Sequence, residues 1–233
     1  MAVTATNTFA PDMAEMAEEA YERAGLKLSS AYDLRTARRS VDFMLLDWQN
    51  RGVNLWTVEE QITSDLVKST AKYTLKADTV AIFEVLLRQN SGNVETQTDF
   101  ELGRISRNTY GGITNKLILG RPTQVFIDRQ QDPDIGVTAT LWPVPDKETT
   151  YKLVYYRMRA MYDSGPGGTY NPDVPNRFWP AFVAGLAYNV ALKRPEVTDR
   201  LPMLKQSYDE TFQLAADEDR EKAPLRLYPG GYR

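Results

Sequence analysis

Residues 31–56 decide the fold, and they read AYDLRTARRSVDFMLLDWQNRGVNLW. Apolar side chains recur there at the three- and four-residue spacing of one helix face. These side chains are Leu34, Ala37, Val41, Met44, Leu45 and Trp48. Ser30 can cap the start, with Asp33 replacing the usual glutamate, and Gly52 can close the end. The pattern predicts a helix over residues 31–50 that holds no evident catalytic group and runs into an aromatic strand.

Three further helices are expected outside this segment. Residues 11–24 place a proline in the first turn and acids in the first half, with Gly25 as a stop. Residues 177–193 are apolar nearly all round, which predicts a helix at the centre of a bundle. This apolar run falls short of the roughly 20 residues that cross a bilayer. Residues 198–220 carry one apolar stripe, formed by Leu201, Leu204, Tyr208, Phe212 and Ala215.

Between these helices the apolar period changes to two, which predicts strands. The expected strands are 56–63, 71–75, 79–88, 123–129, 136–142 and 149–159. The first two are expected to pair through a turn near Lys68 and Ser69. Residues 79–88 are apolar on both faces, so a helix stays open there. Residues 104–110 are expected to form a single helical turn.

The order of helices, strands and helices predicts an α+β fold. A discontinuous helical bundle would be built from residues 1–54 and 175–222. A central antiparallel β insertion would occupy residues 55–174, and residues 223–233 would form an extended C-terminal tail.

The composition excludes several kinds of chemistry. The 233-residue chain is 42% hydrophobic and 25% charged, with a net charge of −3, so it has no basic surplus of the kind that grips nucleic acid. It contains no histidine and no cysteine. A Ser-His-Asp triad, a thiol nucleophile, a zinc finger and a disulfide are therefore all excluded. Carboxylate-pair or lysine chemistry stays open, but no catalytic, cofactor or metal site is predicted.

A row of acids lines the helix expected over residues 11–24. It consists of Glu15, Glu18, Glu19 and Glu22. A glycosidase would need two carboxylates that converge across a cleft. A solvated helix face is the commoner meaning of charges at this spacing.

Three arginines, Arg35, Arg38 and Arg39, lie on one side of the helix over residues 31–50. Contact with phosphate groups is one interpretation. Pairing with acids of a neighbouring helix or subunit is favoured, because Asp33 and Asp42 dilute the local positive charge.

The end of the chain combines apolar, aromatic and cationic groups in a segment too short to fold alone. These residues are Leu225, Arg226, Leu227, Tyr228, Tyr232 and Arg233. Such groups are typical of interface anchors. A frayed terminus is an equally good interpretation of the residues alone.

The sequence resembles head-to-tail adaptor proteins of short-tailed bacteriophages, the tail accessory or tail tubular protein A-like group. The motifs that carry the resemblance are AYDLRTARRSVDFMLLDWQNRGVNLWTVEE, RISRNTY, GRPTQVFIDRQ, LWPVPD, YKLVYYRMR, VPNRFWPAFVAGLAYNVALK and YDETFQLAADEDR. They follow one another in the family's order from about residue 11 to residue 222. These motifs are structural rather than catalytic.

The resemblance implies a virion protein of the head–tail interface, assembled in the host cytoplasm, and not an enzyme. Its subunits would form a ring, twelve-fold in relatives, between the portal protein and the distal (nozzle or tubular) tail protein. Double-stranded DNA would pass through the channel during genome ejection without sequence-specific binding. No cofactor and no membrane would be involved. The tail over residues 223–233 would dock on the portal.

The resemblance also gives the charged residues a role. A ring needs two different complementary faces on each subunit. The residues that could supply them are Arg35, Arg38, Arg39, Glu15, Glu18 and Glu22. A mildly acidic subunit would suit a channel through which DNA slides.

Two other classes of function stay open from the sequence. The first is a tail-associated cell-wall hydrolase with paired carboxylates, which would clear peptidoglycan and lose this activity on mutation of two acids. The second is a nucleic-acid-binding module that uses the three arginines, whose monomer would bind DNA in a salt-dependent way.

Overall fold

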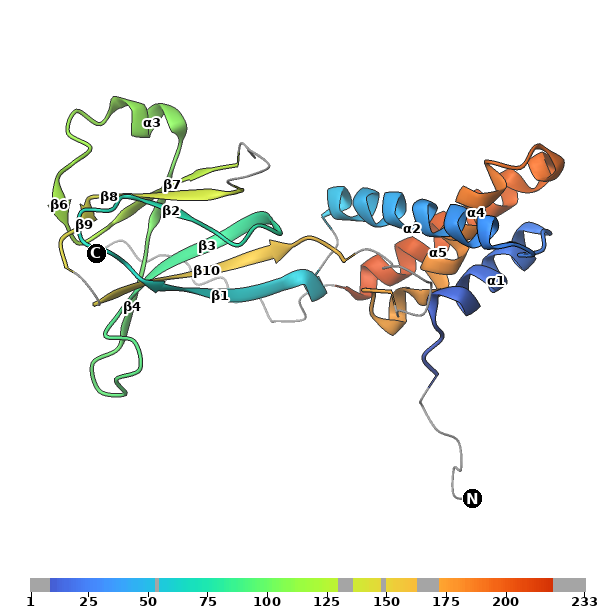
Figure 1. The fold of residues 1–233 in the computed structure, drawn as a ribbon, viewed down its shortest axis with the longest axis horizontal. Helices are drawn as coiled ribbons and strands as arrows, with labels where there is room; N and C mark the ends of the chain where they lie inside the picture. The colour runs from blue at the N-terminus through green and yellow to red at the C-terminus, as the bar shows by residue number, and fades with distance from the viewer. Residues whose placement is uncertain (1–8, 53–54, 130–135, 148–149, 163–171, 220–233) are drawn as a thin grey trace, which may run out of the picture. The chain divides into compact units, whose positions relative to one another are not determined.

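The computed structural model describes residues 9–52, 55–129, 136–147, 150–162 and 172–219 (Figure 1). These residues divide into two compact units. One lies within Met1–Trp56 and Met161–Arg233, and the other lies within Thr57–Ala160. The first unit is helical and the second is built mainly from strands. The predicted α+β fold with a central, largely antiparallel β part is confirmed.

The described part of the helical unit contains two helices from each end of the chain, which lie side by side in Figure 1. They are α1 (Met13–Ala24), α2 (Ala31–Arg51), α4 (Trp179–Ala191) and α5 (Leu201–Glu218). Short 3-10 turns precede the last two, namely η2 (Asn176–Phe178) and η3 (Pro195–Arg200). All four α-helices lie within the ranges that the sequence predicts, apart from the one-residue extension of α2 to Arg51.

Side-chain caps explain where α1 and α2 begin. The Glu15 N–H donates to the Asp12 carboxylate, and the Asp12 N–H donates back to the Glu15 carboxylate. At α2 the Asp33 N–H donates to the Ser30 hydroxyl at 3.2 Å. The Asp33 carboxylate accepts hydrogen bonds from the Ser30 hydroxyl and the Ser29 N–H, whereas in a standard capping box it would accept the Ser30 N–H. The expected cap of α2 is therefore present in a shifted form.

Helix α4 lies at the centre of the helical unit and packs against α1, α2 and α5, as its apolar sequence predicts. Gly185 allows this close packing, because a Cβ there would lie 2.6 Å from the sulfur of Met44. Beside it, the buried Trp48 indole donates to the Tyr208 hydroxyl at 2.7 Å. The Trp48 ring centre also lies 5.3 Å from that of Phe212. One aromatic cluster thus joins α2, α4 and α5.

The described part of the β unit contains two four-stranded sheets and one two-stranded sheet. The first sheet is antiparallel, in the order β1 (Val58–Asp65), β10 (Tyr151–Arg159), β3 (Thr79–Gln89), β4 (Thr98–Glu101). The second has the order β2 (Lys72–Thr74), β8 (Thr138–Trp142), β7 (Gln124–Asp128), β5 (Gly103–Ile105), with β5 and β7 parallel. The third pairs β6 (Leu119–Gly120) with β9 (Val144–Pro145) in parallel. The 3-10 turn η1 (Leu55–Thr57) and the short helix α3 (Arg107–Gly112) complete the elements.

The expected hairpin between residues 56–63 and 71–75 is wrong. Strand β1 pairs with β10, where Ile62 lies opposite Val154, whereas β2 pairs with β8 in the other sheet. The buried Leu66 lies between the two strands, and its N–H donates to the carbonyl of Tyr151 on β10. The chain therefore crosses between sheets after β1. Alternation of apolar residues indicates which face of a strand is buried, but it leaves the partner strand open.

Two other sequence expectations are resolved in this unit. Residues Thr79–Gln89 form strand β3, which rules out the helix alternative. The expected helical turn over residues 104–110 begins later, because Arg104 and Ile105 belong to strand β5. The Ser106 hydroxyl accepts the Thr109 N–H and starts α3 at the next residue.

The core of the β unit contains a fully buried arginine, Arg157 on β10. Its Nη1 donates to Asp78 at 2.6 Å and to the Thr79 hydroxyl at 2.8 Å, while Nε and Nη2 donate to Glu59. These hydrogen bonds, more than the charge alone, lower the pKa of both Glu59 and Asp78 below their ordinary values. We call Arg157, Glu59 and Asp78 the arginine triad.

We expect acid to weaken the β unit through this triad. Because the folded pKa values of Glu59 and Asp78 lie below 4.5 and 3.8, their stabilising effect is complete above those values. The stabilisation is then lost as the pH falls through the lower pKa values that the two carboxyl groups have in the folded state. Thermal melting from about pH 6 to pH 2 should show a steep fall in stability over the acid end. A variant with Glu59→Gln and Asp78→Asn should show a shallower fall, and equal slopes would contradict the assignment.

Candidate functional site

Helix α1 and the start of α4 enclose a groove of about 830 Å³, which we call the acidic groove. Its apolar side chains are Phe9, Pro11, Met16, Trp179, Pro180 and Val183. Its charged side chains are the four acids of α1, namely Glu15, Glu18, Glu19 and Glu22, and the cation Arg23, which pairs with Glu19. The acids that the sequence predicts as contact residues therefore border an apolar hollow, and they are not a plain solvated row.

Two of these acids are already engaged within α1, and two are not. Glu15 accepts the Asp12 N–H in the capping box, and Glu19 accepts the Arg23 guanidinium at 2.7 Å. Glu18 and Glu22 are exposed and lie one helical turn apart. Neither forms an ion pair within the part of the chain that the structure describes. The acids open to a partner are therefore Glu18 and Glu22.

Trp179 forms a fixed wall of the acidic groove. Its indole N–H donates to the carbonyl of Val174 at 3.1 Å, which holds the ring in place. Phe9 packs edge-on against it, with ring centres 5.8 Å apart, and remains 75% exposed. The groove thus presents two aromatic rings that are only partly covered.

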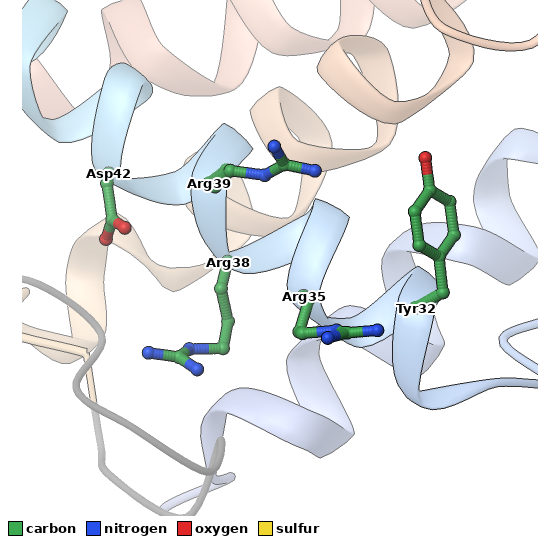
Figure 2. Close-up of a pocket in the computed structure, with 5 residues that line it drawn as sticks. All are labelled: Tyr32, Arg35, Arg38, Arg39 and Asp42. Atoms are coloured by element: carbon green, nitrogen blue, oxygen red, sulfur yellow. The ribbon is translucent and has the colours of Figure 1, made fainter.

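The outward side of α2 carries the predicted arginines (Figure 2). Arg35 and Arg39 point to the side on which Tyr32 stands, whereas Arg38 extends the other way. Together with Asp42 they line a depression of about 440 Å³. Arg38 is half-buried, and its Nε has no hydrogen-bond partner among the described residues. The three arginines therefore line one depression, in which the Arg38 side chain extends away from those of Arg35 and Arg39.

Asp42 supplies a negative charge to this depression, but the three arginines outnumber it. No acid in the described ranges forms an ion pair with Arg35 or Arg39. The nearby Asp33 is engaged by Arg194 at 2.6 Å. Lys193 adds a further cation, with its ammonium donating to the Ser40 hydroxyl at 2.6 Å. Burial, and then the charge of Arg39, lower the pKa of Lys193.

The sequence reasoning missed three exposed apolar side chains on the same side of α2. Tyr32, Phe43 and Leu46 are each more than half exposed. With the two arginines they follow one another at intervals of 3, 4, 4 and 3 residues, which places all five in one stripe along the helix. We call Tyr32, Arg35, Arg39, Phe43 and Leu46 the α2 ridge. The spacing of the five residues was visible in the sequence, but their exposure was not.

The predicted portal-docking residues lie outside the described residues. They are Leu225, Arg226, Leu227, Tyr228, Tyr232 and Arg233. The described chain ends at Asp219, just after α5, and Asp219 is buried. Its carboxylate accepts the Arg177 guanidinium and the Leu55 N–H, the latter at 3.1 Å. The end of α5 is thus fixed to η2 through Arg177 and to the first residue of η1, Leu55.

The described residues also bear on two other kinds of site. They contain no group of three or more acids that could hold a metal ion. They also contain no helix that combines the length and the apolar character needed to span a membrane.

Partly exposed aromatic and apolar side chains, framed by charges without partners, are typical of protein-binding surfaces. The acidic groove and the α2 ridge are therefore surfaces of the kind that an assembly protein presents to its partners. The chain belongs to the SU10 adaptor protein family, whose sequence profile matches residues 13–228. It is a structural adaptor of a bacteriophage and a virion component that interacts with other head and tail proteins. Adaptors of this family are typically not enzymes.

The family match confirms the resemblance to phage head-to-tail adaptors that the sequence motifs indicate. The match covers both units, since it starts at the first residue of α1 and continues past the end of α5. A search of curated proteins finds no match to the chain.

Proposed function

We propose that this chain joins the portal protein to the distal (nozzle or tubular) tail protein as a ring of subunits, twelve-fold as in relatives, that extends the DNA channel. The match to the adaptor family over residues 13–228 carries the proposal. The two surfaces of opposite charge on one helical unit support the ring, because a head-to-tail ring requires two different complementary faces on each subunit.

The proposed subunit contacts use the charged residues of α1 and α2. They are Arg35, Arg38, Arg39, Glu15, Glu18 and Glu22. These residues differ in their exposure and in whether they already have a partner within the subunit. Arg35, Arg39, Glu18 and Glu22 are exposed without a described partner, whereas Glu15 caps α1 and Arg38 is half-buried.

The charge of the chain supports the passage of DNA through such a ring. With a net charge of −3, the subunit has no overall attraction for phosphate groups. A strongly basic lining would hold the DNA and slow its ejection, since affinity for the backbone grows with each phosphate that is neutralised. We infer that double-stranded DNA passes without sequence-specific binding.

We assign the three parts of the chain to three partners. The discontinuous helical bundle of residues 1–54 and 175–222 would form the ring, and the β insertion of residues 55–174 would meet the distal tail protein. The tail of residues 223–233 would dock on the portal. Its tyrosines and leucines would supply the apolar burial and its arginines the charge, as in other interface anchors.

Deletion of residues 225–233 should leave a folded subunit that no longer attaches to the portal. The described residues of the two cores lie between Met13 and Ala216, so we expect the melting temperature of the truncated chain to stay close to that of the full chain. Attachment is measured by electron microscopy and co-sedimentation with emptied capsids that lack the adaptor. A control chain in which the nine residues are replaced by glycine and serine shows whether attachment depends on the side chains of the tail or only on its length. Normal attachment of the truncated chain would remove the tail from the proposal.

A further inference from the structure

We propose that the α2 ridge of one subunit lies in the acidic groove of the next subunit. The inference rests on the proposed ring and goes beyond it, because it assigns the two surfaces to each other and adds the apolar residues of both. The occupant of the groove is thus a second copy of this chain.

The spacing of the charges fits this pairing. Arg35 and Arg39 are four residues apart on α2, and Glu18 and Glu22 are four residues apart on α1. Four residues of helix rise about 6 Å, so two arginines and two glutamates can meet as two pairs at once. Exposed ion pairs contribute little to stability by themselves. Their effect here is to set the register and to accelerate the encounter.

The apolar side chains supply the attraction that exposed charges cannot. Phe43 is 71% exposed on the ridge, and Leu46 lies one turn further along the same stripe. The groove offers the rings of Phe9 and Trp179 beside the apolar side chain of Val183. Aromatic side chains that enter a partly apolar hollow are the usual anchors of protein interfaces. Burial of Phe43 against Trp179 would therefore hold neighbouring subunits together.

Within one subunit, the α2 ridge cannot lie in the acidic groove of the same subunit. The opposite side of α2, with Val41 and Trp48, is buried against the rest of the helical unit. The ridge consequently faces away from α4, which forms one wall of the groove. Each subunit is left with one donor surface and one acceptor surface, and repetition of this contact produces a ring.

A charge-exchange experiment tests the pairing. Variant A carries Arg35→Glu and Arg39→Glu, and variant B carries Glu18→Arg and Glu22→Arg. Each alone places like charges opposite each other, so we expect the concentration for half-maximal ring formation on emptied capsids to rise about tenfold or more. An equal mixture restores opposite charges at every contact. It should therefore form rings again, with A and B alternating.

Controls separate assembly from folding. Variant C reverses two exposed charges of α5 outside both surfaces, Lys205→Glu and Asp209→Arg, and should form rings as the wild type does. Phe43→Ser should weaken ring formation, whereas Leu214→Ser, at a site on α5 with the same 71% exposure, should not. All variants should keep the melting temperature of the monomer near that of the wild type, since the changed residues are exposed.

The outcomes distinguish this inference from the proposed function. Wild-type rings on the portal without recovery in the A and B mixture would overturn the pairing and leave the ring in place. Absence of any wild-type ring would overturn the proposed function itself. Normal rings from variant A with reduced DNA binding would assign the ridge to DNA and overturn the pairing.

Discussion

Replacement of Arg157 by methionine should lower the free energy of unfolding of the β unit by about 3 kcal/mol. Methionine keeps much of the apolar stem but leaves Glu59 and Asp78 without their shared cation. Removal of one partner from a buried ion pair typically costs about 3–5 kcal/mol. We expect the lower end, because the side chains of Glu59 and Asp78 are 33% and 27% exposed and can be partly rehydrated.

Two further variants make the Arg157 prediction specific. The triple change Arg157→Met, Glu59→Gln and Asp78→Asn removes every charge of the arginine triad and should recover most of the lost stability. Arg157→Lys should recover little, because a single ammonium cannot bond both carboxylates as the guanidinium does. Urea denaturation gives the free energies, and hydrogen exchange shows whether residues 57–160 lose protection. A loss below about 1 kcal/mol for Arg157→Met would contradict the prediction.

The sequence predicts the helical unit well because its signals are local. Apolar residues at helical spacing, a capping side chain and a closing glycine all lie within one helix. Gly25 and Gly52, predicted as stops, adopt left-handed conformations with φ of 77° and 72° at the ends of α1 and α2. Such features require no knowledge of distant parts of the chain.

The β unit is predicted less well because its pairing is long-range. Strand β1 finds its partner β10 about 90 residues later, and nothing in the alternation of β1 names that partner. The same holds for Arg157, which is one of three cations in strand β10, with Lys152 and Arg159. Its burial depends on Glu59 and Asp78, which come from two other segments. A charge inside a strand pattern is a weak signal of such a triad, since exposed strand positions carry charges as well.

The sequence shows the charged residues of the acidic groove and of the α2 ridge, but it does not show the shape of either surface. The acids of α1 and the arginines of α2 are visible in the sequence, but which of them have local partners is not. Trp179 reaches the groove from a segment more than 150 residues beyond α1. Phe43 lies among core residues in the sequence, and only the packing of α2 shows that it points outward. A groove needs the relative placement of two helices, which local patterns do not give.

Helix α2 combines the two roles on opposite sides. Its inner side builds the core through Trp48, and its outer side carries the α2 ridge with Phe43. Variants of the two sides should therefore separate folding from assembly. Ridge variants should fail in ring formation with an unchanged melting temperature. Core variants should have a lower melting temperature but should still form rings at temperatures where they remain folded.

Trp48→Ala is the core variant with the largest expected effect, a loss of about 3–5 kcal/mol from the helical unit. The change leaves a cavity among three phenylalanine rings, those of Phe178, Phe182 and Phe212. It also removes the donor that bonds the buried Tyr208 hydroxyl. The cost is high because α2, α4 and α5 all meet at this indole.

Trp48→Phe separates packing from hydrogen bonding at this position. It keeps most of the ring but not the N–H, so we expect a smaller loss of about 1–2 kcal/mol. Urea denaturation, monitored by circular dichroism of the backbone so that the signal does not depend on the replaced tryptophan, measures the free energy of unfolding of both variants. Hydrogen exchange should locate the lost protection in α2, α4 and α5. At low temperature, Trp48→Ala should still form rings on emptied capsids, because the α2 ridge is unchanged. An alanine variant as stable as the phenylalanine variant would show that the cavity closes by rearrangement, and that the indole does not hold the three helices together.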